Sequence, residues 1–85
     1  MITVRFFGTF RLNCGIRELR CEAGSVKELY PAIIAEAKKI KPETNITMKS
    51  LKSCIVAVNG TRIEKLNTKL ADGDEVFFFP AVAGG

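Results

Sequence analysis

Hydrophobic and polar residues alternate over residues 2–7 of this chain, a pattern typical of a strand with one buried side. Over residues 2–7, Phe7 points outward and the buried side is formed by Ile2, Val4 and Phe6. Over residues 75–79, Phe78 lies on one face of the strand and the other face carries Phe77 and Phe79. The pattern therefore predicts two strands that each pack one face on a core.

Turn signals divide the rest of the chain. Gly8 and the segment 13–15 indicate a hairpin turn before a second strand over residues 16–21. The segment 51–58 contains the strongest buried-strand run, and the pair Asn59-Gly60 after it predicts a two-residue hairpin with a short return strand over 61–63. A tight turn at 72–74 precedes the last strand, and Pro80 ends that strand because proline cannot donate to its ladder.

A change to helical spacing predicts one main helix. Ser25 begins it, and Glu28 three residues later predicts a capping box. The apolar face is formed by Val26, Leu29, Tyr30, Ile33, Ile34, Ala37 and Ile40. Pro42 ends the helix, and the segment 42–50 reads as a loop. Pro31 conflicts with this helix, so either the first turn is distorted or the main helix starts at Pro31.

These elements predict a two-layer α+β domain. One amphipathic helix covers only one face of a sheet. The first and last strands are natural central neighbours, which gives a β-grasp, or ubiquitin-like, mixed sheet packed on one main helix. We expect this domain to span residues 1–79 and to be followed by a flexible C-terminal tail over residues 80–85.

The tail is expected to stay loose because its residues are small. Ordering its six residues would cost roughly 6–12 kcal/mol of backbone entropy. Burying a valine returns only about 1.5–3 kcal/mol. Gly84-Gly85 carries no side chains, so the backbone can pass through a slot too narrow for a Cβ atom.

Composition narrows the classes of function. No apolar run approaches a membrane span and residues 1–5 do not read as a signal peptide, so we expect a cytoplasmic protein. The chain has no histidine and no C-x-x-C pair, which argues against a zinc site and against imidazole chemistry. Cys14, Cys21 and Cys54 are expected to be free thiols, with Cys14 placed in a turn where it can be exposed.

The positive charge of the chain leaves nucleic-acid binding as an alternative function. Residues 1–71 hold 13 basic and 6 acidic residues, a balance of +7, and such a body can meet nucleic acid or an acidic partner. Base stacking would need aromatic residues interleaved with the basic ones, but the phenylalanines gather near the acid-flanked tail. A plain interaction domain with an inert tail is the third alternative.

The chain by itself has few side chains that could catalyse a reaction. It has no P-loop and no dinucleotide fingerprint, and its only clustered carboxylates, Asp72, Asp74 and Glu75, suit turn capping. The C-terminal carboxylate of Gly85 is then the remaining reactive group, and a partner must activate it with ATP. If Phe7 and Phe79 share the uncovered face of the sheet, they form an exposed apolar patch beside the tail, which favours a protein interface.

The C-terminal segment 70–85 resembles the end of the MoaD/ThiS sulfur carriers and is closest to the small subunit of molybdopterin synthase. The segments 4–8 and 56–60 match that family in kind and position, and Ala81 stands where the family often has a second proline. The resemblance implies that Gly85, with Gly84, is the site of adenylation and thiocarboxylate formation. It also implies a partner-binding set at Phe7, Arg11, Phe79, Pro80 and Val82.

The family implies that the chain is not catalytic alone. A ubiquitin-activating-enzyme-like partner would adenylate Gly85 with Mg-ATP, and a sulfur donor would form the thiocarboxylate. The large synthase subunit would then use that sulfur on a pterin precursor in molybdenum or tungsten cofactor biosynthesis. The chain itself would hold no permanent cofactor and no metal. Sulfur delivery of the thiamine or thiolation type, and attachment to protein lysines, remain as alternatives with the same tail chemistry.

Overall fold

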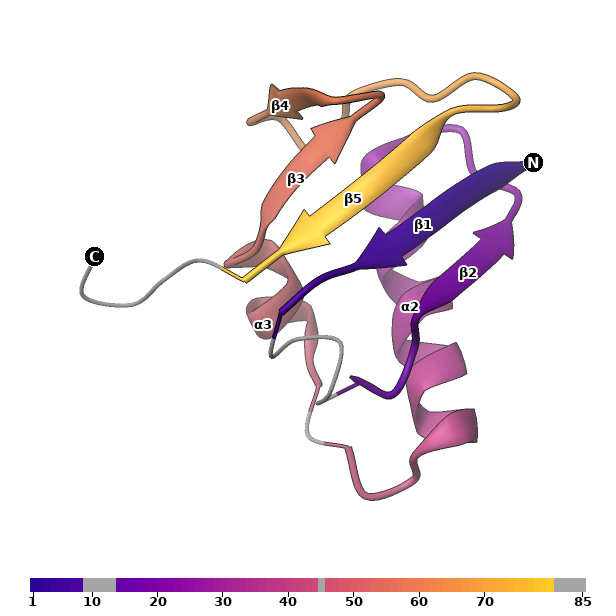
Figure 1. Cartoon of the computed structure of the whole chain (residues 1–85), viewed down its shortest axis with the longest axis vertical. Coiled ribbons are helices and arrows are strands. Elements are labelled where there is room, and N and C mark those ends of the chain that lie inside the picture. Colours follow the sequence, from indigo (N-terminus) through magenta and orange to yellow (C-terminus); the bar gives the residue numbers. More distant parts are fainter. Residues whose placement is uncertain (9–13, 45, 81–85) are drawn as a thin grey trace.

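The computed structural model describes residues 1–8, 14–44 and 46–80, which form one five-stranded sheet with helices on one face (Figure 1). The elements in chain order are β1 (Ile2–Phe6), β2 (Glu18–Cys21), α2 (Val26–Ile40), α3 (Met48–Lys52), β3 (Ile55–Val58), β4 (Thr61–Ile63) and β5 (Glu75–Phe79). The strand order is β2-β1-β5-β3-β4. The predicted α+β, β-grasp arrangement is confirmed.

The first and last strands are neighbours at the centre of the sheet, as predicted. β1 and β5 run parallel, with Val4 opposite Val76 and Phe6 opposite Phe78. The pairs β1–β2, β3–β5 and β3–β4 are antiparallel, so the sheet is mixed. Parallel pairing places the carboxyl ends of β1 and β5 at the same edge of the sheet, and the candidate site lies there.

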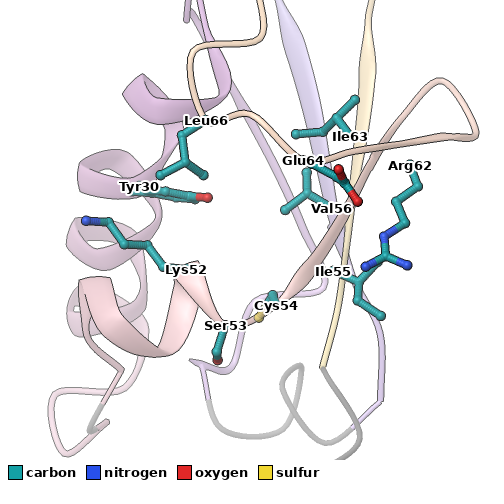
Figure 2. Close-up of a pocket in the computed structure, with 10 residues that line it drawn as sticks. All are labelled: Tyr30, Lys52, Ser53, Cys54, Ile55, Val56, Arg62, Ile63, Glu64 and Leu66. Carbon is teal, nitrogen blue, oxygen red and sulfur yellow. The ribbon is translucent and has the colours of Figure 1, made fainter.

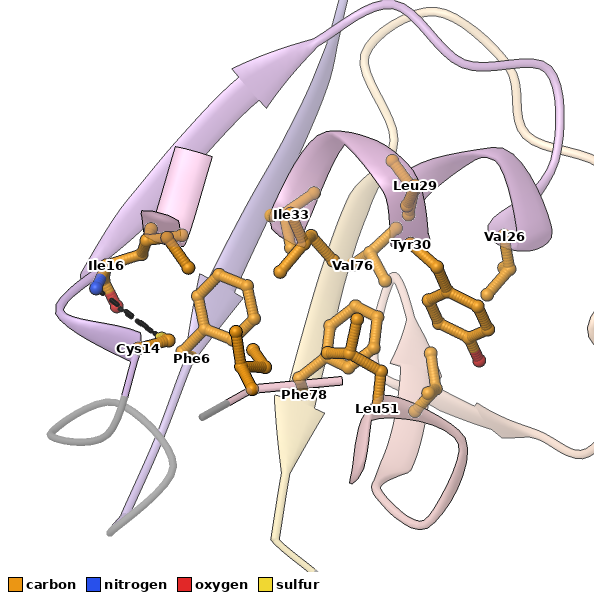
Figure 3. Packing of buried hydrophobic residues seen from close by; sticks show 14 of the residues in the cluster. Phe6, Cys14, Ile16, Val26, Leu29, Tyr30, Ile33, Leu51, Val76 and Phe78 are labelled. Atoms are coloured by element: carbon orange, nitrogen blue, oxygen red, sulfur yellow. Dashed lines mark hydrogen bonds between the residues drawn. The ribbon is translucent and has the colours of Figure 1, made fainter. Parts of the chain in front are cut away.

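The core fills the space between the sheet and α2 (Figure 3). Every residue predicted on the inner side of β1 is at most 2% exposed, and Val76 and Phe78 of β5 are fully buried. The Phe6 and Phe78 rings lie 5.4 Å apart between centroids, and Tyr30 of α2 meets Phe78 edge to face at 6.1 Å. Each fully buried large side chain contributes about 1.5–3 kcal/mol to folding. This packing fixes β1 and β5 and therefore the side chains on their outer face.

The start of α2 differs from the predicted capping box. Ser25 occupies the N-cap position, but its hydroxyl donates to the Glu28 carboxylate at 3.2 Å and makes no capping bond to the backbone. The first two amides of the helix instead donate to carbonyls of the loop before β5. Val26 N–H binds Thr68 O at 3.0 Å, and Lys27 N–H binds Leu66 O at 2.8 Å. The capping-box prediction was wrong because tertiary contacts supply the acceptors that the box would have supplied.

The alternative that the main helix starts at Pro31 is wrong. α2 runs without interruption from residue 26 to residue 40, with Pro31 inside it. The side chain of Pro31 is exposed, so water can bind the Lys27 carbonyl, which a proline nitrogen cannot satisfy. Ile40 was also assigned wrongly to the buried face, because it is 51% exposed.

Three further local predictions need correction. The segment 42–50, expected as a loop, contains the start of α3, whose N-cap Thr47 forms a capping box with Ser50. The second strand begins at residue 18 and not at 16. Cys14, expected where it could be exposed, is fully buried, and its sulfur accepts a hydrogen bond from Ile16 N–H at 3.4 Å.

Two predicted turns close the end of the sheet at which β5 begins. Asn59 and Gly60 have φ values of 52° and 87°, as their hairpin requires, and Gly73 has a φ of 92°. The Asp74 carboxylate joins these turns, accepting from Ala71 N–H at 2.8 Å and from Asn59 Nδ2 at 2.9 Å. These two hydrogen bonds, the backbone bond first, hold the pKa of Asp74 below its ordinary value.

Candidate functional site

The face of the sheet away from the helices carries three phenylalanines, which we call the aromatic patch: Phe7, Phe77 and Phe79. Phe79 and Phe77 alternate with the buried Phe78 along β5. Phe7 follows β1 directly, and its amide donates to Phe78 O at 3.1 Å. The parallel pairing of β1 and β5 therefore brings outward side chains from the two strands together.

The rings of the aromatic patch are in contact with one another. Phe7 and Phe79 are stacked, with centroids 4.9 Å apart and planes 12° from parallel. Phe77 lies 5.8 Å from Phe7 and 6.5 Å from Phe79. Phe7 is 39% exposed and Phe79 is 37% exposed, so the stack faces solvent. An exposed aromatic cluster of this kind is typical of a protein interface.

An ionic network borders the aromatic patch on the same face. Arg5, which lies opposite Phe77 in the parallel register, binds Glu18 of β2 at 3.1 Å and Glu75 of β5 at 3.6 Å. Glu18 also binds Arg20 at 3.5 Å. Exposed pairs like these add little stability, about 0–1 kcal/mol each, so their main effect is to hold Arg5 beside the aromatic rings.

The chain leaves β5 next to the aromatic patch. Pro80 follows Phe79 and lies against Gly8, where an added Cβ would stand 3.0 Å from Pro80 Cγ. Gly8 has a φ of +68°, a conformation that side-chain-bearing residues rarely adopt. Gly8 therefore lets the chain at the end of β1 and the segment after β5 approach each other closely.

The structure brings together three of the predicted partner-binding residues: Phe7, Phe79 and Pro80. The other predicted site residues, Arg11, Val82, Gly84 and Gly85, lie outside the described residues, as does most of the proposed tail. Phe77 and Arg5 were absent from the predicted set. The alternation of both strands could have found them, because each lies two positions before a predicted patch residue.

Among the described residues, the cysteines are not activated as nucleophiles and no side chains form a metal centre. No cluster of three or more metal-ligating side chains occurs among residues 1–8, 14–44 and 46–80. The cysteines there are free thiols, as predicted. Burial, with a smaller effect of Cys14, raises the pKa of Cys54 to about 11, and burial also raises the pKa of Cys14 and Cys21. These thiols are therefore protonated at neutral pH and poorly nucleophilic.

The described helices include none long and apolar enough to cross a membrane. The sequence comparison gives a family for nearly the whole chain. The model of the ThiS family matches residues 4–85, which includes the aromatic patch, all of β5 and the last three residues of β1. No curated protein matches the sequence.

Solved structures of similar chains support the same relationship. A chain of the complex of subunits 1 and 2 of molybdopterin-converting factor from Helicobacter pylori is 34% identical, with a TM-score of 0.63, and the match covers 99% of this chain and 97% of that one. Small archaeal modifier protein 1 from Methanosarcina acetivorans is 26% identical, with a TM-score of 0.72 and coverages of 99% and 95%. A putative subunit 1 of molybdopterin converting factor from Pyrococcus furiosus is 29% identical, with a TM-score of 0.65 and coverages of 95% and 97%.

Proposed function

Because this chain belongs to the ThiS family of ubiquitin-like sulfur carriers, we propose that it carries sulfur on its C-terminal glycine to a partner enzyme. The pathway that we propose is molybdenum or tungsten cofactor biosynthesis, with this chain as the small subunit of a molybdopterin synthase. The likeness to a chain of the molybdopterin-converting factor complex from Helicobacter pylori supports this choice.

The observation that carries the proposal is the position of the aromatic patch. The stacked pair Phe7 and Phe79 faces solvent directly beside Pro80, from which the segment with Gly84 and Gly85 continues. A partner that docks on these rings therefore receives the end of β5 at its surface. Five extended residues after Pro80 span roughly 17 Å, enough to reach into an active site while the folded body stays outside.

The proposed chemistry takes place in the partners. An oxygen of the Gly85 carboxylate attacks the α-phosphorus of ATP on an activating enzyme, which forms an acyl-adenylate and releases pyrophosphate. Hydrosulfide released by a sulfur donor then attacks the acyl carbon and AMP leaves, so that after loss of a proton the chain ends in a thiocarboxylate. On a large synthase subunit the thiocarboxylate sulfur finally bonds to a pterin precursor, and water hydrolyses the acyl–sulfur bond, which returns the Gly85 carboxylate. The carrier contributes the docking surface and the reacting terminus, and the absence of side chains at Gly84 and Gly85 admits the backbone to a narrow channel.

Intact mass measurement tests the carrier function. The chain is incubated with an activating enzyme, Mg-ATP and a sulfur source, and the expected product is heavier by the difference between sulfur and oxygen. Deletion of Gly85 is expected to abolish this gain while the thermal unfolding midpoint stays unchanged. Normal sulfur transfer by the deleted chain would contradict the proposal.

A second candidate is attachment to protein lysines, which uses the same activated terminus. The likeness to small archaeal modifier protein 1, with a TM-score of 0.72, supports this second candidate. Immunoblotting of cells that express a tagged chain separates the two functions. Discrete high-mass conjugates that vanish on deletion of Gly85 would favour the modifier, and thiocarboxylate without conjugates would favour sulfur delivery.

A further inference from the structure

The two sides of the β3–β4 hairpin differ. On the side of the helices, Val56 and Ile63 border a pocket of about 700 Å³ beside Tyr30 (Figure 2). The Tyr30 hydroxyl makes no hydrogen bond within the described part of the chain, but it has almost no exposed surface that a ligand could contact. The other side of the hairpin belongs to the face of the sheet that carries the aromatic patch.

The strand register continues the apolar surface of the aromatic patch onto β3. Ile55 pairs with Phe79 in the antiparallel register of β3 and β5. Ala57 pairs with Phe77 in the same register. Side chains paired across neighbouring strands project from the same face of a sheet. Neither Ile55 nor Ala57 is part of the core cluster that the described residues form, whereas Val56 between them is. The exposed apolar surface therefore extends from β5 to β3.

Arg62 lies at the β4 end of this apolar surface. It pairs with Ala57 across β3 and β4, so its side chain projects from the face away from the helices. Figure 2 shows Arg62 and Ile55 on the opposite side of β3 from Tyr30. Ala57 is only 8% exposed on a face without helices, as expected for a small side chain between Phe77 and Arg62. The stem of Arg62 thus borders the apolar surface.

The charge of Arg62 has no partner within the part of the chain that the structure describes. Arg62 is exposed and forms no ion pair there, not even with Glu64 two residues further along. Arg5, on the other side of the aromatic patch, binds both Glu18 and Glu75. The apolar surface therefore lies between a cation that is already paired and one that is not.

Docking on this surface would change the surroundings of Arg62. A partner that covers Phe79 and Ile55 also takes the neighbouring guanidinium partly out of water. That loss of hydration is costly unless the partner supplies hydrogen-bond acceptors. A carboxylate suits this position best, because it carries the opposite charge and accepts two parallel N–H···O hydrogen bonds from one guanidinium.

We propose that Arg62 selects the protein partner of the aromatic patch by binding an aspartate or glutamate at the edge of that partner's apolar docking surface. The apolar centre of the partner packs on Phe7, Phe79 and Ile55, and the acidic side chain meets Arg62. A protein with a cation at this place is rejected by charge repulsion. The inference rests on the proposed function, which requires a docking partner but does not specify its charge.

Calorimetric titration with the large molybdopterin synthase subunit of the same organism provides the first test. Arg62→Leu is expected to weaken binding roughly tenfold and to reduce its dependence on salt, because one charge-assisted contact is lost. Arg62→Glu is expected to weaken binding further through repulsion between two carboxylates. Lys38→Leu makes the same change at an exposed residue of α2, in the helical layer, and should leave binding unchanged.

Chemical cross-linking identifies the acidic group directly. A carbodiimide joins a carboxylate to a lysine amine but not to a guanidinium. With the Arg62→Lys chain bound to the large subunit, mass spectrometry is expected to find position 62 linked to an aspartate or glutamate of that subunit. The unmodified chain serves as the control and should show no link at position 62.

Two results distinguish this inference from the proposed function. If Phe79→Ala weakens binding tenfold while Arg62→Leu binds as tightly as the unmodified chain or more tightly, Arg62 has no selecting role and the synthase assignment stands. If the unmodified chain does not bind the large subunit, both the assignment and this inference are wrong. Equal losses in Arg62→Leu and Lys38→Leu, or no carbodiimide link at position 62, would overturn this inference alone.

Discussion

Single residues at the exit of β5 determine how the candidate site is presented. Gly8 lets Pro80 approach, and Phe79 stacks on Phe7, so the last strand and the segment after the first strand are held together at one edge of the sheet. Neither contact involves the core. Substitutions here are therefore expected to affect the site more than they affect folding.

Phe79→Ala is the direct test of the aromatic patch. It is expected to cost only about 0.5–1.5 kcal/mol of stability, because Phe79 is exposed and loses mainly its ring contacts. Affinity for the proposed partner, a large synthase subunit, is expected to fall roughly tenfold or more, as for an aromatic hot-spot residue. Calorimetric titration measures the affinity, and Ile40→Ala, another exposed apolar side chain, is the control. Equal losses in the two variants would argue against a specific role for Phe79.

Gly8→Ala tests the close approach to Pro80. A left-handed conformation costs an alanine about 1–2 kcal/mol, and the added Cβ must also displace Pro80. Gly60→Ala is the matched control, since Gly60 also has a positive φ but has nothing within 4 Å of the added Cβ. Urea unfolding should therefore show a larger loss for Gly8→Ala than for Gly60→Ala. Equal losses would mean that Pro80 moves aside without cost.

At the scale of elements, strands were easier to predict than helix ends. The alternation of apolar and polar residues in β1 identified its buried and outward side chains. In β5 the period-two geometry placed Phe77 and Phe79 on one face and Phe78 on the other, and the structure shows that Phe78 is on the buried one. The ends of α2 depend on partners far along the chain, since the loop carbonyls of Leu66 and Thr68 take the first amides. α3 has only five residues, and its main signal was the short cap at Thr47 and Ser50. Its segment therefore read as a loop.

Pro31 is the element-scale test of α2. Pro31→Ala restores an amide that can donate to the Lys27 carbonyl, and it removes the clash of the proline ring with the preceding turn. We expect the free energy of unfolding to rise by about 1–3 kcal/mol, because proline in a helix interior costs about 3 kcal/mol relative to alanine. Guanidinium unfolding measures the gain. Pro42→Ala, which lies beyond the end of the helix, should change stability much less, and an equal gain there would contradict this account.

At the scale of the whole molecule, the two ends of the sheet differ. Turns are hydrogen-bonded to each other at one end, which we call the closed end, and the other end carries the aromatic patch. Asp74 and Asn59 join two turns where β5 begins, and the aromatic patch lies where β5 ends. The patch could be predicted from the alternation and from the central pairing of the first and last strands. The pocket beside Tyr30 could not, because it depends on how α3 and the β3–β4 hairpin sit around a side chain that sequence periodicity assigns only to the core.

The closed end gives the fold a dependence on pH. Because the folded chain holds the pKa of Asp74 below its ordinary value, the stabilisation is present above the unfolded pKa and is lost as pH falls through the folded pKa. Urea midpoints measured from neutral to strongly acidic pH should therefore decline less steeply in Asp74→Asn than in the unmodified chain. The comparison variant, Asp72→Asn, leaves the turn hydrogen bonds intact and removes only the exposed ion pair of Asp72 with the N-terminal amine. A decline in Asp74→Asn as steep as in the unmodified chain would contradict this assignment.

The central place of β5 also constrains when the protein can fold. Synthesis proceeds at about 5–20 residues per second from the N-terminus, so β1 to β4 emerge before their shared neighbour exists. Without β5 the sheet lacks the strand that joins β1 to β3, and contacts between distant parts of the chain form slowly. A nascent chain halted before residue 75 therefore has no complete core. In this fold, any molecule with a finished core has also completed the strand that precedes the C-terminal segment in which we propose the sulfur-carrying glycine.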